Sequence, residues 1–263
     1  MRRIIKKIAS SSLQREAEYA VLLPRSYETS DLRYPVLYLL HGLFGSYQNW
    51  FELTDIEDFA NDLSLIIVMP DGSDGWYSDS ETTPTNRYES FFIHDLIPDV
   101  ENRYRTIATK EGRAIAGLSM GGYGAFKFAL RYPDRFKLAA SFSGAFDAPE
   151  RSDEAPGFDW DTLKPSVLQA FGASDSITRT RNDVYKLVLS LKVQDIGRLP
   201  HFYFDCGASD GFIVANMRLK ALFDAIGVVH EFAEVEGGHD WDYWGSRLPG
   251  LLKLTVEQLA GPS

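Results

Sequence analysis

The feature that most constrains this chain is an alternation of short apolar runs with longer segments of helical period. The runs at 34–41 and 65–70 are almost continuously apolar and are followed by Gly42 and Asp71. Such a run is typical of a strand buried on both faces. Further runs stand at 18–23, 113–117, 138–143, 201–205 and 228–235. Helical spacing lies between them, at 92–104, 121–132, 217–226 and up to about Leu259. This alternation predicts an α/β fold with a mainly parallel sheet and helices on both faces.

Composition excludes several other classes of protein. Hydrophobic residues make up 44% of the 263, enough apolar surface to exclude disorder. The net charge of −10 repels phosphate backbones and disfavours nucleic-acid binding. No apolar run approaches the roughly 18 residues that span a bilayer, so no membrane contact is expected. Cys206 stands alone and cannot form an internal disulfide.

The ends and the middle of the chain bear on its organisation. Lys6 and Lys7 interrupt the N-terminal isoleucines, so we expect a short strand there rather than a signal peptide, and a cytoplasmic protein. Neither an internal repeat nor a Pro-, Gly- or Ser-rich linker stands out. We therefore predict a single domain over 1–263. Its irregular part is an insertion at about 145–195, where Pro, Asp and Ser break the apolar pattern.

One motif indicates chemistry. Gly117-Leu-Ser119-Met-Gly121 has the form G-x-S-x-G and joins a predicted strand to a predicted helix. In this context the serine sits on a sharp, strained turn, with its hydroxyl exposed at the top of the sheet. A helix begins just beyond it and favours developing negative charge. Ser119 is therefore the candidate nucleophile.

A nucleophilic serine needs a histidine base and an acid that orients it, in the chain order Ser, Asp or Glu, His. His239 lies in a glycine-bounded loop and is the predicted base, whereas His230 lies inside an apolar strand. Asp210, in the loop after the strand 201–205, is the preferred acid. Asp205 belongs to that strand, and Asp175 is the reserve candidate.

An oxyanion hole would complete such a site. One donor is the backbone N–H of Met120, the residue after the nucleophile. The loop 41–45 is expected to supply the other through Leu43, because its glycines let the backbone turn its amides inward. His41 ends a strand beside Gly42, and we assign it to shaping this loop.

Further characteristic stretches lie along the chain, at 38–43, 68–72, 76–77, 88–91, 95–98, 117–122, 205–207 with Asp210, and 238–241. With these stretches the chain resembles, over about 18–245, the esterase branch of the α/β-hydrolase fold. That branch includes esterase D, S-formylglutathione hydrolases, tributyrin and acetyl esterases, feruloyl and acetylxylan esterases, and antigen 85 mycolyltransferases. The resemblance implies an α/β-hydrolase fold, the triad Ser119, Asp210 and His239, and oxyanion amides at Leu43 and Met120.

Bulky aromatic residues cluster beside the predicted machinery. Phe44, Trp76, Trp241 and Trp244 are the candidates for substrate binding, with Tyr47, Trp50, Tyr77 and Tyr243 nearby. Packing of the loops against the core is an equally weighted reading of this cluster. If the rings line the site, they leave a shallow slot that favours short acyl chains. We find no metal-ligand cluster and no phosphate-binding loop, and expect no cofactor.

The sequence thus predicts a serine carboxylesterase that hydrolyses short-chain acyl esters through an acyl-enzyme. The alternatives are an S-formylglutathione hydrolase, which is a thioesterase, then a feruloyl or acetylxylan-type esterase or an acyltransferase. A non-catalytic binding module would have a broken triad, and here all three members are present. The expected partner is a small ester or thioester, and self-association stays open.

Overall fold

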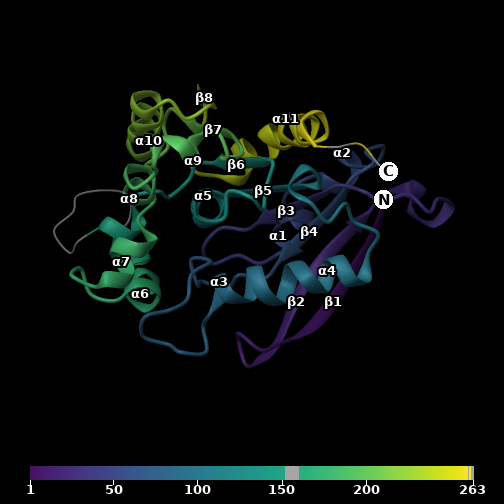
Figure 1. Ribbon diagram of the computed structural model, residues 1–263, viewed down its shortest axis with the longest axis horizontal. Helices are drawn as coiled ribbons and strands as arrows, with labels where there is room; N and C mark the ends of the chain where they lie inside the picture. Colours follow the sequence, from purple (N-terminus) through teal and green to yellow (C-terminus); the bar gives the residue numbers. More distant parts are fainter. Residues whose placement is uncertain (152–159, 260, 262–263) are drawn as a thin grey trace.

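The computed structural model describes residues 1–151, 160–259 and 261 and is organised around one eight-stranded sheet (Figure 1). Its strands are β1 (Arg2–Ser10), β2 (Arg15–Leu23), β3 (Val36–Leu40), β4 (Ile66–Pro70), β5 (Arg113–Leu118), β6 (Leu138–Phe142), β7 (His201–Gly207) and β8 (His230–Val235). They lie in the order β1-β2-β4-β3-β5-β6-β7-β8. β2 is antiparallel to β1 and β4, and the pairs from β4 through β8 are parallel. The predicted mainly parallel sheet is confirmed.

The helices of the described residues vary widely in length. They are α1 (Asn49–Glu52), α2 (Ile56–Phe59), α3 (Tyr88–Ser90), α4 (Ile97–Arg103), α5 (Met120–Arg131), α6 (Trp160–Phe171), α7 (Ile177–Asn182), α8 (Val184–Leu189), α9 (Val193–Ile196), α10 (Ile213–Ile226) and α11 (Trp241–Gln258). None in the described part of the chain is long and apolar enough to cross a bilayer.

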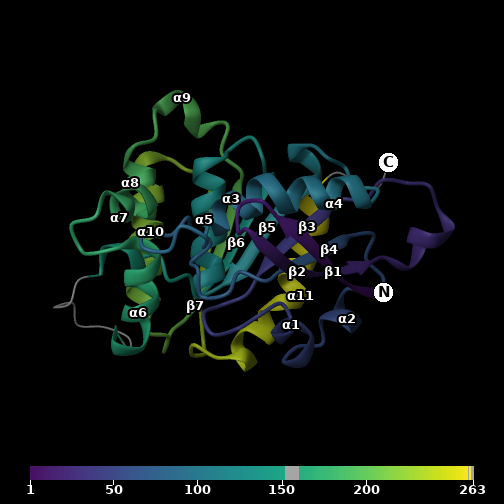
Figure 2. The same ribbon diagram turned by 90° about the horizontal axis from the view of Figure 1, so that it is seen from below.

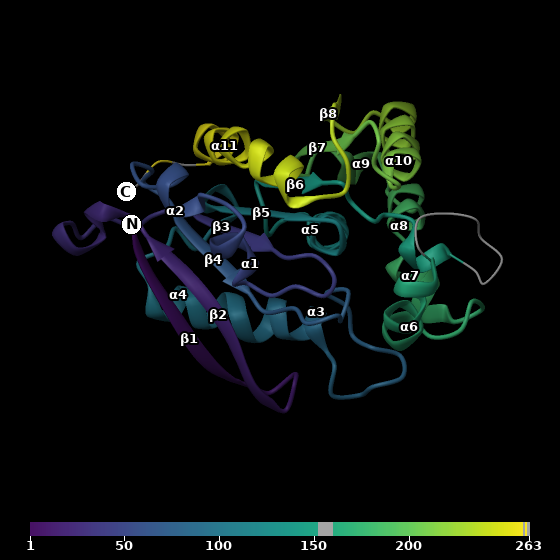
Figure 3. The same cartoon turned by 180° about the vertical axis from the view of Figure 1, so that it is seen from behind.

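Helices cover both faces of the sheet, as β3 shows residue by residue. Leu37 and Leu39 join a core cluster with α1, α2 and α11, whereas Tyr38 and Leu40 join the cluster under α4, α5 and α10. Successive side chains of a strand point to opposite faces, so a strand between two helical layers must be apolar throughout. Figure 3 shows the sheet between these layers, with α11 on one side and α4 on the other, and Figure 2 views the molecule from the side of α4.

The helix predicted over 92–104 differs in detail from the one observed. A wide π-helical turn over Phe91–Leu96 connects α3 to α4. Pro98 then stands in the first turn of α4, where a missing N–H breaks no intrahelical hydrogen bond. The predicted helix is thus divided into a π-helical turn and α4, with the proline at the start of α4.

The segment 145–195 contains more regular structure than its sequence suggests. Its described residues include α6, α7 and α8, which gather at one end of the molecule (Figure 1). Pro165 lies inside α6, and polar residues interrupt the short helices, which hides their period. α6 matters for function because two of its residues line the pocket described below.

Candidate active site

Ser119 stands at the sharp turn between β5 and α5. Its backbone has φ 52° and ψ −117°, a strained conformation for a residue with a side chain. The flanking glycines permit the turn because a Cβ on Gly117 would lie 2.5 Å from the backbone of Gly121. A Cβ on Gly121 would lie 2.5 Å from the carbonyl oxygen of Leu40. The spacing of the motif is therefore a requirement of close backbone packing.

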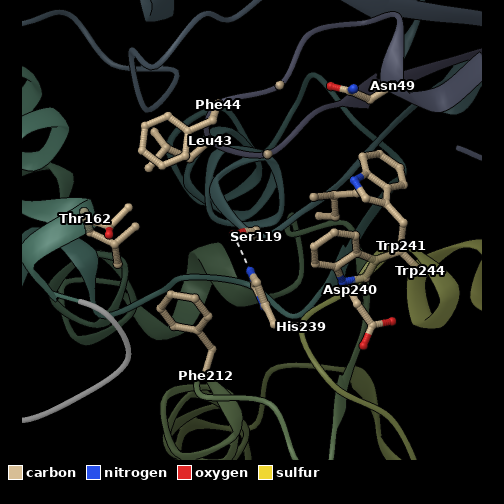
Figure 4. Close-up of a pocket in the computed structure, with 14 residues that line it drawn as sticks. Leu43, Phe44, Asn49, Ser119, Thr162, Phe212, His239, Asp240, Trp241 and Trp244 are labelled. Carbon is tan, nitrogen blue, oxygen red and sulfur yellow. Dashed lines mark hydrogen bonds between the residues drawn. The ribbon is translucent and has the colours of Figure 1, made fainter. Parts of the chain in front are cut away.

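The predicted nucleophile, base and acid come together in one hydrogen-bonded row. Figure 4 shows its Ser119–His239 hydrogen bond as a dashed line. The Ser119 Oγ lies 3.0 Å from His239 Nε2, and His239 Nδ1 lies 2.9 Å from Asp210 Oδ2. An ionised carboxylate only accepts hydrogen bonds, so Nδ1 carries the imidazole proton and Nε2 is left to accept from Ser119. This is the tautomer that a general base for Ser119 requires.

Asp210 is held in its charged form. Burial by itself raises the pKa of this carboxyl, but hydrogen bonds from His239, from the Phe212 N–H and from Ser143 outweigh it. The net effect is a pKa below the ordinary value for aspartate. The Phe212 N–H donates to Oδ1 at 2.8 Å, which leaves Oδ2 directed at the imidazole.

Two backbone N–H groups lie beside the nucleophile. Met120 is the first residue of α5, so the helix offers its N–H no acceptor. Gly42 approaches so closely that a Cβ there would lie 3.5 Å from the Cβ of Ser119, and Leu43 follows it into the pocket lining. Among the described residues, Leu43 N–H has no hydrogen-bond acceptor. The loop thus has the position expected for an oxyanion hole.

His41 fixes the conformation of that loop. Its Nδ1–H donates to the carbonyl of Gly42 at 2.7 Å, and its Nε2 accepts from the Gly72 N–H at 2.8 Å. The buried ring therefore ties the end of β3 to the loop after β4. Its placement agrees with the loop-shaping role predicted for it.

A pocket of about 510 Å³ opens over Ser119. On one side lie Thr162 of α6 and Phe212, and on the other Trp241 and Trp244 of α11 (Figure 4). Leu163 follows Thr162 in the pocket lining. Phe44, at 66% exposure, lies at the rim. The walls are thus mainly apolar, and the hydrogen-bonding groups gather at the floor.

Trp76 is a correction to the predicted substrate-binding set. Its side chain is 1% exposed and does not line the pocket. The indole N–H donates to Ser166 Oγ at 3.0 Å, and the ring packs against Tyr123 and Phe171. With its apolar ring buried and its N–H hydrogen-bonded, Trp76 packs against α6 outside the pocket lining. The packing interpretation likewise holds for Tyr47, Trp50, Tyr77 and Tyr243, which are all buried away from the pocket lining.

The structure also locates the two alternative acids, Asp205 and Asp175, and both lie away from His239. Asp205 is fully buried and accepts hydrogen bonds from Tyr203, Tyr243 and Arg247, away from His239. Asp175 is exposed, in the turn between α6 and α7. Neither hydrogen-bonds to the imidazole in the part of the chain that the structure describes.

Sequence reasoning missed several residues around the site. The ring of Phe212 lies 5.1 Å from the imidazole of His239, opposite Trp244 at 4.9 Å. Its position two residues after Asp210 was the available signal. Asn49, Thr162 and Leu163 also line the pocket, but nothing in their sequence context relates α1 or α6 to Ser119. Within the described ranges, no group of three or more His, Cys, Asp or Glu side chains could hold a metal ion.

The sheet order, the strained serine after β5 and the histidine after β8 define the class as the α/β-hydrolase fold. Solved structures agree. A ferulic acid esterase is 28% identical, with a TM-score of 0.83 over 98% of each chain. An S-formylglutathione hydrolase from Staphylococcus aureus is 25% identical, with a TM-score of 0.81 over 97% of this chain and 98% of its own. MPT51 from Mycobacterium tuberculosis, at 17% identity and a TM-score of 0.80, shares the fold.

Within that class, the sequence model of the family described as "Putative esterase" matches residues 10–255, and this chain belongs to that family. Esterase Rv1288 of Mycobacterium tuberculosis H37Rv is 36% identical over 238 residues, which cover 83% of this chain and 51% of the relative. The chain therefore spans about half the length of that relative. An acetyl esterase from Caldicellulosiruptor saccharolyticus is 29% identical over 220 residues, covering 82% of this chain and 81% of its own.

Proposed function

We propose that this protein is a serine carboxylesterase that hydrolyses short-chain acyl esters through an acyl-enzyme. The observation that carries the proposal is the row Ser119–His239–Asp210 at the floor of an apolar pocket, with the N–H groups of Leu43 and Met120 beside it. The names of the relatives and the family support ester hydrolysis as the reaction class.

In the acylation half-reaction, His239 Nε2 takes the proton of Ser119 as Oγ bonds to the ester carbonyl carbon. The carbonyl π electrons move to oxygen, and the N–H groups of Leu43 and Met120 bind the resulting oxyanion. When the carbonyl re-forms, the bond to the alcohol oxygen breaks, and His239 returns the proton to that oxygen. Asp210 stabilises the transient imidazolium throughout.

In the deacylation half-reaction, a water molecule replaces the alcohol. His239 removes one water proton while the water oxygen bonds to the acyl carbon. The Ser119 Oγ–carbon bond then breaks, and the proton on His239 passes to Oγ. The products are a carboxylic acid and the free enzyme, so the cycle requires no cofactor.

The pocket favours neutral esters over a glutathione thioester. Among the described lining residues none is Lys or Arg, and besides His239 the one ionisable side chain is the carboxylate of Asp240. The two carboxylates of a glutathione conjugate would find no cation there, in a chain of net charge −10. A feruloyl ester is the second candidate, because Phe212 and Trp244 offer aromatic surface beside the base.

The decisive experiment replaces Ser119 with Ala. This change removes the nucleophile and only the volume of a hydroxyl, so kcat for p-nitrophenyl acetate should fall by about 10³-fold or more. A fluorophosphonate should add mass to the peptide containing Ser119 in the wild type and not in the variant. Turnover of the folded variant near the wild-type rate would refute the proposal. Methyl ferulate and S-formylglutathione, assayed alongside, separate the alternatives.

A further inference from the structure

Ser143, which immediately follows β6, lies under the active site without lining the pocket. It is fully buried, and its backbone N–H donates to the Asp205 carbonyl oxygen at the end of β7 at 2.8 Å. Its φ is 51°, in the left-handed region that a residue with a side chain adopts at a cost. Glycine would adopt this conformation freely, so a serine here requires a reason beyond the turn.

The partners of the Ser143 hydroxyl determine where its proton goes. The indole Nε1 of Trp244 donates to Ser143 Oγ at 3.2 Å, and an indole N–H cannot accept. The single hydroxyl proton is therefore left for an acceptor. The Asp210 carboxylate, whose pKa is lowered in part by Ser143, is the charged acceptor beside it. The thiol of Cys206, also beside the hydroxyl, is a much weaker acceptor than a carboxylate.

Trp244 has a second contact with the same machinery. Its ring lies edge to face with the imidazole of His239, at a centroid distance of 4.9 Å and an interplanar angle of 89°. The indole thus contacts His239 with its ring while its N–H donates to the Ser143 hydroxyl. Trp244 lies in the first turn of α11. This one turn of helix therefore contacts both His239 and Ser143.

We propose that Ser143 is a positioning residue for the catalytic carboxylate, with its hydroxyl aimed at Asp210 by the Trp244 indole. The inference rests on the proposed function, because it assigns to Asp210 the role of orienting His239. With donors from His239, Phe212 N–H and Ser143, the carboxylate is fixed in position and in charge.

Removal of the Ser143 hydroxyl should change the pH dependence of activity in a definite direction. One donor fewer leaves more negative charge on the Asp210 oxygens that face His239, which favours the imidazolium. Because only the neutral imidazole is a base, the acidic limb of the kcat/KM profile should move to higher pH. The other ionisable groups packed nearby are Asp205 and Cys206 on β7, Asp240 next to His239, and Arg151 over the Phe212 ring. The substitution replaces none of these residues, and among them Cys206 lies beside the Ser143 hydroxyl.

The test compares Ser143→Ala and Ser143→Gly with Ser141→Ala. Ser141 is the matched control: it lies two residues earlier, is equally buried, and within the described residues its Oγ has no hydrogen-bond partner. Both Ser143 variants should lower kcat roughly tenfold, leave KM within about twofold and move the acidic limb up by roughly half a pH unit. Ser141→Ala should change none of these.

Ser143→Gly separates positioning from stability, because glycine relieves the strained φ and should keep or raise the Tm while activity falls. If both variants keep the wild-type kcat and pH limb, or if activity falls without a shift of the limb, the inference is wrong. Trp244→Phe, which keeps a ring and loses the N–H, should move the limb in the same direction. Combined with Ser143→Ala it should move the limb no further; an additive shift would contradict the orienting role of the indole.

Failure of the Ser143 proposal can be distinguished from failure of the proposed esterase function. If Ser119→Ala keeps its activity, the esterase mechanism itself is wrong. If Ser119→Ala is inactive and the Ser143 variants behave like Ser141→Ala, only the role of Ser143 is refuted.

Discussion

At the scale of single residues, a carboxylate near the end of β7 and one in the loop after it have opposite environments. Asp205 and Asp210 are both buried, but Asp205 faces Arg247 and two tyrosine hydroxyls, whereas Asp210 faces an imidazole. Burial raises the pKa of Asp205 and is not fully offset, while the donors around Asp210 lower its pKa. Both residues are aspartates, so the difference between their pKa values comes from their hydrogen-bond partners and not from their chemical type.

This difference predicts unequal effects of Asp→Asn substitutions on activity. In Asp210→Asn the amide N–H₂ can donate to Nδ1, which moves the imidazole proton to Nε2, where it can no longer accept from Ser119. We expect a fall in kcat of about 10⁴-fold in a variant that stays folded. Asp205→Asn should mainly lower the Tm, because the Arg247 charge loses its partner. Asp175→Asn is the exposed control, and a larger loss of kcat there than in Asp210→Asn would refute the assignment of the acid.

At the scale of elements, α6 and α11 form opposite walls of the pocket, and we expect their side chains to limit the length of the acyl chain. Thr162 on α6 and Trp244 on α11 lie on opposite sides of Ser119 (Figure 4), and Leu163 follows Thr162 in the pocket lining. Each methylene that fits adds at most about 0.8 kcal/mol, whereas one that collides with packed side chains costs about 1–3 kcal/mol. We therefore expect kcat/KM to peak at acyl chains of about two to four carbons and then to fall.

Replacement of a wall residue should move that optimum. Leu163→Ala removes the tip of the α6 wall and should shift the best p-nitrophenyl ester from acetate or butyrate toward hexanoate or octanoate. Leu189→Ala, an exposed leucine on α8 outside the pocket lining, is the matched control and should leave the profile unchanged. A wild-type maximum at octanoate or palmitate would show that the aromatic residues line an extended channel instead.

At the scale of the whole molecule, a buried ionic cluster links α3 to α5. Glu89 of α3 accepts hydrogen bonds from Lys127 and Arg131 of α5, and also from Tyr132. Burial opposes ionisation of Glu89, but the two cations outweigh it and lower its pKa from 4.5 to about 2. Lys127 is fully buried, and this burial lowers its pKa to about 8.

The cluster predicts how stability depends on pH. Because the folded-state pKa of Glu89 is lowered, its contribution is fully present above pH 4.5 and is lost as the pH falls toward 2. The shift corresponds to on the order of 3 kcal/mol. Glu89→Gln should therefore lower the Tm at pH 7 and flatten the loss of Tm between pH 4.5 and 2 in thermal melts. Glu16→Gln, at an exposed ion pair, is the control; equal effects of the two substitutions would contradict this account.

The sequence by itself determined the elements of the sheet and the candidate nucleophile. Apolar runs and glycine-bounded turns are local signals, so β3 and the turn at Ser119 follow from a few consecutive residues. His239 could be chosen because one candidate histidine lay in a loop and the other inside a strand. The fold class and the family were accessible for the same reason, since they rest on patterns read along the chain.

Loop placement in the sequence favoured Asp210 as the acid, but only the tertiary structure shows its contact with His239 and which aromatic rings face the pocket. Asp205 and Asp210 are both plausible in sequence, and Trp76 and Trp244 are equally bulky, yet one of each pair turns away from the site. Ser143 carries no signal at all in sequence, because its role depends on Trp244, 101 positions away. These facts depend on how loops from distant strands pack together, and burial and hydrogen-bond geometry between such loops arise only when the sheet assembles.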